Sequence, residues 1–197
     1  EAILSVDTFY ARVAREAVHA GASMVNDVSA GTIDPLLIPA VASLQVPYVL
    51  MHMQGSPATM QQEPYYENVT REVLDFFIQQ LPPLREAGIR DIIIDPGFGF
   101  GKTITHNFKL LHDLAVFSMT GHPVLLGISR KSTVYKTLGI TAAEALNGTT
   151  ALHTVGLLNG AGILRVHDVK EAVETTWPVQ RTPRAGRAFS IRDIMQF

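Results

Sequence analysis

Six short apolar segments of this 197-residue chain each end in polar or charged residues, which a buried strand does not normally hold. The segments and the residues that follow them are Ile3–Val6 before Asp7 and Thr8, Met24-Val25 before Asn26 and Asp27, Tyr48–Met51 before His52, Ile92–Ile94 before Asp95, Val124–Ile128 before Ser129, Arg130 and Lys131, and Ile163-Leu164 before Arg165 and His167. Carboxylates and amides accept hydrogen bonds, whereas arginine, lysine and histidine bind anions. The pattern predicts one surface that combines both kinds of group.

The elements that must position these residues are strands alternating with helices. Strands are expected over 2–7, 23–28, 47–53, 91–95, 123–128 and 162–167, and helices over 9–20, 35–44, 105–117, 142–158, from near Val69 and from near Asp168. Pro82-Pro83 should break or kink the helix that begins near Val69. The long polar loop Gln54–Asn68 is expected to be a functional lid. Alternating strand and helix is typical of a parallel sheet, whose strand carboxyl ends form the rim where ligands bind.

The number of strand–helix units indicates the fold. Six units of about 30 residues make most of a (β/α)8 TIM barrel, whose usual size is about 250 residues. We therefore expect an α/β fold of this class with about six βα units in this chain; an open doubly wound sheet is the alternative. The barrel domain is expected to span 1–178, and 179–197 reads as a basic C-terminal extension. The chain starts at Glu1, close to a strand, so we expect two further units to precede it.

Composition narrows the class of protein. The chain is 47% hydrophobic and 17% charged with a net charge of −2, a balance that favours a globular domain and neither nucleic acid nor a membrane as a partner. It has no cysteine, which excludes disulfides and thiolate metal sites and favours the cytoplasm. The histidines and carboxylates lack the close spacing of a preformed metal cage.

The segment from Asp95 to Lys102, which reads Asp-Pro-Gly-Phe-Gly-Phe-Gly-Lys, has three alternating glycines. A Walker A loop would need glycine at Pro96, and a dinucleotide fingerprint would need glycine or alanine at Lys102, so both nucleotide motifs fail. One interpretation is a tight turn in which Asp95 is the turn residue before the proline. The other is a ligand site, because a carboxylate that closes a strand of three isoleucines must be satisfied by something.

Two further segments carry cations. Arg130 and Lys131 stand where a helix or loop begins, and two cations there oppose the helix dipole, which favours an anionic or polar ligand over a solvated pair. The alternation of side chains along a strand should place Arg165 and His167 on the same side, where they suit a phosphate-type anion. Asp168 looks like a structural helix cap, with Glu171 completing a capping box.

Two residues keep structural alternatives. Asp7 could cap a helix instead of facing the rim, and His52 reads better as a buried core histidine than as a ligand.

Six segments taken together resemble the dihydropteroate synthase family, and they occur in the family's order over about Ile3 to Glu174. They are Ser5–Thr8, Val25–Ser29, Leu50–Gly55, Asp95–Lys102, Ser129–Ser132 and Arg165–Val169. The resemblance implies a (β/α)8 barrel enzyme of folate biosynthesis, a transferase that joins 6-hydroxymethyl-dihydropterin pyrophosphate to p-aminobenzoate and releases pyrophosphate. It also implies inhibition by sulfonamides, a magnesium cofactor (Mg²⁺) and a homodimer.

The resemblance also implies a role for each matching residue. Asp95 and Lys131 would be catalytic. The pterin-binding residues would be Asp7, Asn26, Met51, Asp95, Arg130 and Lys131, the aminobenzoate-binding residues Phe100, Lys131 and Ser132, and the pyrophosphate-binding residues Arg165 and His167. The family mechanism is SN1-like: pyrophosphate leaves, the pterin methylene cation is stabilised, and the arylamine attacks.

The chain also departs from the family pattern, because the first two strands and their loops are absent from it. In the family these carry the asparagine that ligates magnesium and a loop that shapes the aminobenzoate site. We therefore expect no protein metal ligand and no synthase turnover from residues 1–197 alone, with open edges at both the first and the last strand. The alternatives are a pterin-binding fragment that needs a partner segment, and a methyltetrahydrofolate-binding methyltransferase domain. Arg130, Lys131, Arg165 and His167 argue against the methyltransferase, whose substrate carries no pyrophosphate.

Overall fold

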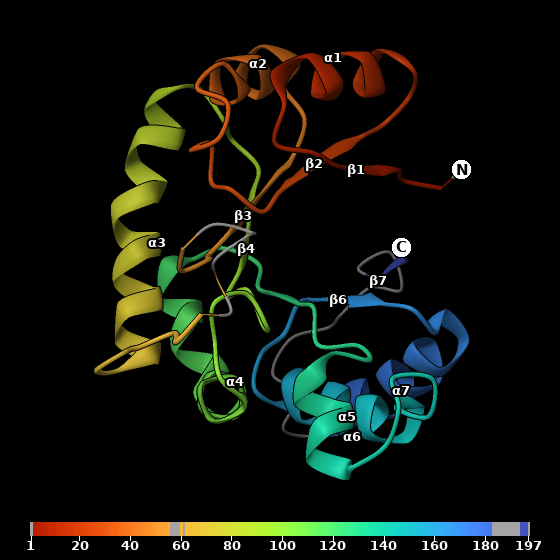
Figure 1. Cartoon of the computed structure of the whole chain (residues 1–197). Coiled ribbons are helices and arrows are strands. Elements are labelled where there is room, and N and C mark those ends of the chain that lie inside the picture. The colour runs from red at the N-terminus through yellow and green to blue at the C-terminus, as the bar shows by residue number, and fades with distance from the viewer. Residues whose placement is uncertain (1, 56–59, 61, 183–193, 197) are drawn as a thin grey trace.

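The computed structural model describes residues 2–55, 60, 62–182 and 194–196. Strands alternate with helices along the chain as expected, except that two helical segments, rather than one, follow the fourth strand and the fifth strand (Figure 1). The elements are β1 Ser5–Asp7, α1 Ala11–His19, β2 Met24–Asp27, α2 Leu37–Leu44, β3 Tyr48–Met51, α3 Val69–Glu86, β4 Ile92–Asp95, α4 Ile104–His112, the 3-10 helix η1 Leu114–Thr120, β5 Leu125–Leu126, α5 Ser132–Leu138, α6 Leu146–Leu158, β6 Ile163–Val166, α7 Val169–Gln180 and β7 Ile194–Gln196.

The strands are parallel and neighbour one another in chain order. β1 through β4 form one sheet, β5 through β7 form a second, and a parallel bridge between Ile94 and Val124 joins them. An open doubly wound sheet reverses its strand order at a switch point, and the described strands β1 to β6 show no reversal. The arrangement is therefore an arc of a parallel barrel with its helices outside (Figure 1).

Alternating residues along the strands divide the core into an inner and an outer layer. Val49, Ile93, Leu125 and Ile163, from four successive strands, form one buried cluster with Met24 packed against it. Their strand neighbours Leu50, Ile94, Leu126 and Leu164 belong to a second cluster that includes residues of the helices. One inward side chain from each of several strands at one level is the layering of a barrel interior. The same pleat brings the residues at the strand ends to one rim.

The C-terminal region corrects one expectation. We expected β6 to be an open edge, but β7 pairs parallel to it, with Leu164 opposite Ile194. The helix α7 continues past Pro178 to Gln180, because proline at this position removes only one hydrogen bond from the last turn. The domain boundary at residue 178 stays a prediction. Of the arginines in the expected extension, Arg184, Arg187 and Arg192 lie outside the described residues, as does part of the predicted lid.

The expected break at Pro82-Pro83 is wrong, because α3 runs through both prolines. The two missing N–H groups leave carbonyls without partners one turn earlier, at Ile78 and Gln79. Both of these residues are exposed, so water can satisfy the two carbonyls. Asn68 begins the helix and accepts a hydrogen bond from the backbone N–H of Arg71.

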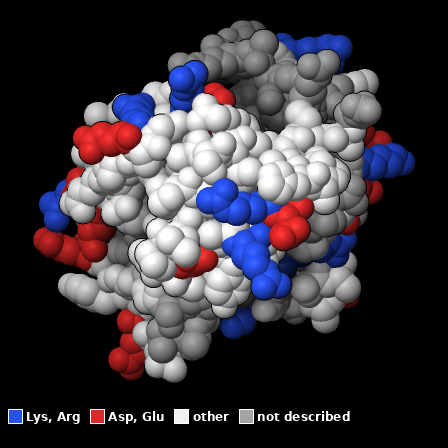
Figure 2. Space-filling view, turned by 90° about the horizontal axis from the view of Figure 1, so that it is seen from above, with Lys and Arg blue, Asp and Glu red and all other residues white. Residues whose placement is uncertain are grey.

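Neither sign of charge dominates the face drawn in Figure 2, where acidic and basic side chains are interspersed. None of the helices in the described part of the chain combines the length and apolar character that crossing a bilayer requires.

Candidate active site at the strand carboxyl ends

Asp7, Asn26 and Arg165 meet at the rim although the last is 158 residues from the first. Asp7 and Asn26 are opposite each other in the β1–β2 register, and Asn26 Nδ2 donates to Asp7 Oδ1 at 2.7 Å. Arg165 Nη2, from β6, donates to Asp7 Oδ2. Asn26 is only 5% exposed, and its Oδ1 has no hydrogen-bond partner among the described residues. A buried acceptor without a partner is costly and indicates a missing donor.

Asp95 ends β4 and is 5% exposed. Its Oδ1 accepts the backbone N–H of Gly97 at 2.8 Å. Burial raises the pKa of Asp95, and this effect exceeds the opposing influence of Lys131, Lys102 and Arg165. The Oδ1 atom of Asp95 therefore has the role that a turn residue would have. The carboxylate is in addition surrounded by the three cations Lys131, Lys102 and Arg165.

Lys131 extends from the N-terminus of α5 toward the glycine-rich segment after β4. Its Nζ donates to the carbonyl of Phe98 at 2.6 Å and lies 4.7 Å from the ring centroid of Phe100. Burial lowers the pKa of Lys131 to about 8, against the attraction of Asp95. Lys131 thus connects two of the predicted subsites, and Ser132 follows it directly as the first residue of α5.

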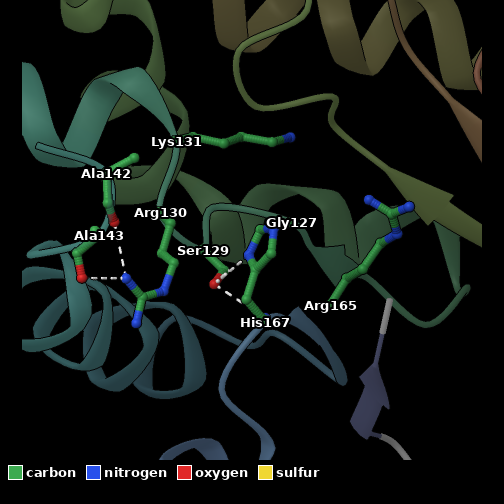
Figure 3. A pocket seen from close by; sticks show the side chains of 8 residues that line it. All are labelled: Gly127, Ser129, Arg130, Lys131, Ala142, Ala143, Arg165 and His167. Atoms are coloured by element: carbon green, nitrogen blue, oxygen red, sulfur yellow. Dashed lines mark hydrogen bonds between the residues drawn. The ribbon is translucent and has the colours of Figure 1, made fainter.

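A cavity of about 530 Å³ opens beside Lys131 and Arg165 (Figure 3). Its lining residues are Gly127, Ser129, Arg130, Lys131, Ala142, Ala143, Arg165 and His167. His167 Nδ1 lies 2.9 Å from Ser129 Oγ, which orients the imidazole at the rim. Lys131, Arg165 and His167 give the cavity its basic character, so an anion suits it.

Arg130 makes contacts that the sequence did not predict. Its guanidinium is paired with both carboxylate oxygens of Asp168 at 2.7 and 2.8 Å, and it donates to the carbonyls of Ala142 and Ala143. Figure 3 shows it turned toward the two alanines and away from Lys131 and Arg165. The charge that we attributed to a ligand is therefore already balanced by a protein carboxylate. The predicted contact of Arg130 with a pterin stays a prediction.

Asp168 occupies the N-cap position of α7, but its side chain caps no backbone N–H. The expected capping box is therefore wrong, because the carboxylate pairs with Arg130 instead. Asp7 is not a helix cap either: Tyr10 occupies the N-cap position of α1, and its backbone N–H donates to the Thr8 hydroxyl oxygen.

Lys102 is the main feature that sequence reasoning missed. It is 4% exposed, and its Nζ lies 3.0 Å from the carbonyl oxygens of both Gly97 and Phe100 and 2.9 Å from His52 Nδ1. Its Nζ therefore links the glycine-rich segment to the end of β3. His52 is 7% exposed, which confirms its interpretation as a buried histidine, and burial lowers its pKa to about 3.

The burial of Lys102 predicts a pH effect on stability. Burial lowers its pKa from an ordinary 10.5 to about 7, so between these values the unfolded chain binds a proton that the folded chain does not. Stability rises with pH under that condition. We expect the unfolding free energy of the wild type, minus that of Lys102→Met, to increase from pH 7 to pH 10. Urea unfolding at several pH values measures it; exposed Lys136→Met is the control, and a flat difference would contradict the prediction.

Two other predicted residues lie where their strands place them. Met51 is opposite Asp95 in the β3–β4 register and is 2% exposed. Asp27, next to Asn26, is fully buried and accepts hydrogen bonds from Ser29 and the Tyr48 hydroxyl, so it is structural. Ala142 and Ala143 could not be predicted, because they act through backbone carbonyls that accept hydrogen bonds from Arg130. Backbone carbonyls carry no signature in the sequence.

Comparison with known proteins places this fold and rim in a class. The family described as "Pterin binding enzyme" matches residues 1–167, and the chain belongs to that family. It is 42% identical over 184 residues to the dihydropteroate synthase of Escherichia coli K12, and 39% identical over 170 residues to that of Bacillus subtilis 168. These alignments cover 92% and 85% of this chain but only 65% and 57% of the relatives.

Solved dihydropteroate synthase structures are similar in fold. A Yersinia pestis dihydropteroate synthase in a sulfonamide drug complex matches with a TM-score of 0.88 at 40% identity, covering 91% of this chain and 66% of that one. A Xanthomonas albilineans dihydropteroate synthase with 4-aminobenzoic acid matches with a TM-score of 0.84 at 42% identity, covering 92% and 66%. The TIM-barrel class is thereby confirmed, with part of the barrel present in this chain.

Proposed function

We propose that this chain carries the pterin and pyrophosphate subsites of a dihydropteroate synthase, which condenses 6-hydroxymethyl-7,8-dihydropterin pyrophosphate with p-aminobenzoate. The observation that carries the proposal is the unpartnered Oδ1 of Asn26, buried beside Asp7 at a rim that also holds Asp95. A pterin edge presents a row of N–H donors, which such acceptors bind. The basic cavity next to them suits the leaving pyrophosphate.

Each group then has a task in the condensation. Arg165 and His167 hold the pyrophosphate and offset its charge as the C–O bond breaks. The Asp95 and Asp7 carboxylates hold the pterin edge and favour the methylene cation. Phe100, Lys131 and Ser132 line the approach of the arylamine, whose ring packs near the Phe100 ring that Lys131 already contacts.

Magnesium is proposed from the resemblance alone. No group of three or more histidines, aspartates or glutamates within the described ranges could hold a metal ion, so these residues do not form a metal cage. No step above depends on the ion. A homodimer and a cytoplasmic location are likewise proposals. Exposed Val155 and Leu158 on α6 and Trp177 on α7 supply apolar surface for a second copy.

Calorimetry with the pterin pyrophosphate tests the proposed function. The wild-type chain should bind the ester and inorganic pyrophosphate, and Arg165→Ala should weaken both by roughly tenfold or more, the size expected for a charged hydrogen-bonded contact. The same substitution should leave the binding of a phosphate-free pterin unweakened. Equal weakening of all three ligands would mean that Arg165 is structural, and absence of pterin binding by the wild type would refute the proposal.

A further inference from the structure

Arg165 is shared between two candidate subsites. Its guanidinium lines the cavity proposed for pyrophosphate, and it is also paired with Asp7, a carboxylate proposed to hold the pterin. The second oxygen of Asp7 accepts the Asn26 amide. Both carboxylate oxygens of Asp7 are therefore engaged by protein groups.

The Arg165–Asp7 pair has the properties of an exchangeable contact. The Asp7 side chain is 54% exposed, and ion pairs that water reaches contribute little to stability. Two oxygens of a phosphate group accept bidentate hydrogen bonds from the planar guanidinium, and pyrophosphate carries more negative charge than a carboxylate. The other charged groups that act on this region are Asp95, which Arg165 stabilises in its ionised form, and Lys131, whose charge repels the guanidinium. An anion beside Lys131 and His167 therefore attracts the Arg165 guanidinium away from Asp7.

We propose that pyrophosphate and pterin bind with positive coupling, because each ligand requires the same Arg165–Asp7 ion pair to be broken. An anion withdraws Arg165 from Asp7 and frees the Asp7 Oδ2 atom for a pterin N–H donor. This proposal rests on the proposed function. It implies a sequence of release: when pyrophosphate departs, Arg165 pairs with Asp7 again and loosens the hold on the pterin moiety of the product.

Titrations with 6-hydroxymethylpterin and inorganic pyrophosphate measure the coupling. In the wild type, saturating pyrophosphate should lower the pterin Kd by about two- to fivefold, as expected for displacement of a partly exposed ion pair. By linkage, saturating pterin must lower the pyrophosphate Kd by the same factor. Isothermal calorimetry on the whole 197-residue chain provides both numbers.

Three substitutions separate the ion pair from other causes. Arg165→Met should bind phosphate-free pterin more tightly than the wild type does, by that same factor, because Asp7 is free. Asp7→Asn should bind pyrophosphate more tightly and should abolish the coupling. His167→Gln should weaken pyrophosphate binding but keep the coupling factor. Glu171→Gln is the control for charge, since it removes a carboxylate that acts on Arg130 instead, and should alter pyrophosphate binding less than Asp7→Asn.

The outcomes that overturn the proposal are distinct from those that overturn the function. Coupling that persists in Asp7→Asn would show that pyrophosphate and pterin contact each other directly, and the ion pair would be irrelevant. An unchanged pyrophosphate Kd in Asp7→Asn would show that Arg165 is not shared, and this holds even if no pterin binds. Binding of both ligands to the wild type without coupling would leave the proposed function intact and refute this inference alone.

Discussion

Gly97→Ala should destabilise the protein by about 3–5 kcal/mol, at the upper end of single-residue effects. A Cβ atom on Gly97 would lie 1.9 Å from the carbonyl oxygen of His52, a distance that only a backbone shift can relieve. The shift would pull the glycine-rich segment from β3, and with it the carbonyl that Lys102 binds. Gly97 also has a φ of +71°, which adds the strain of a left-handed alanine.

Gly121→Ala is the matched control for this strain. Gly121 has a φ of +73°, but a Cβ there would meet no atom within 4 Å. Its substitution should cost only the backbone term, about 1 kcal/mol. Equilibrium unfolding in urea compares the two variants, and equal losses would show that the contact between Gly97 and His52 can relax without cost.

The fold could be predicted because each strand carries its own local signal. Ile92–Ile94 before Asp95 marks a buried strand and its rim end within four residues, and β4 spans Ile92–Asp95. Asn26 and Asp95 could be placed at the rim for the same reason, since parallel strands share one direction. The failures concern partners that are distant in sequence. Nothing near Arg130 shows that Asp168 will neutralise it, and the two are 38 positions apart.

Lys102 illustrates a second limit. Lysine is rarely buried, so nothing in the sequence indicates that Lys102 lies in the core. It stands out only as a residue of nucleotide motifs that do not match. Its burial depends on carbonyl groups that the turn geometry presents, and backbone carbonyls are invisible in a sequence. The prediction of a break at the prolines of α3 failed for a related reason. A lost hydrogen bond matters little where water reaches the freed carbonyl, and tertiary packing decides which carbonyls water reaches.

Asp95→Asn should reduce the affinity for pterin by about 2–4 kcal/mol, or roughly thirty- to several-hundred-fold. The substitution keeps the size of the side chain but replaces one acceptor oxygen with a donor NH₂ group, which would face the N–H donors of the ligand. It also removes the negative charge that Lys131 and Arg165 face, which leaves two partly buried cations less compensated.

The pH dependence of binding separates these effects from general damage. Burial raises the pKa of Asp95 above its ordinary 3.8, so wild-type pterin binding should begin to fall at a higher pH than an exposed aspartate would give. Asp95→Asn should lack this acidic limb, because asparagine does not titrate. Asp91→Asn is the matched control, since it makes the same change at an exposed residue just before the same strand. Calorimetry from pH 4 to pH 8 on the three proteins decides the matter: an affinity unchanged in Asp95→Asn would remove Asp95 from the site.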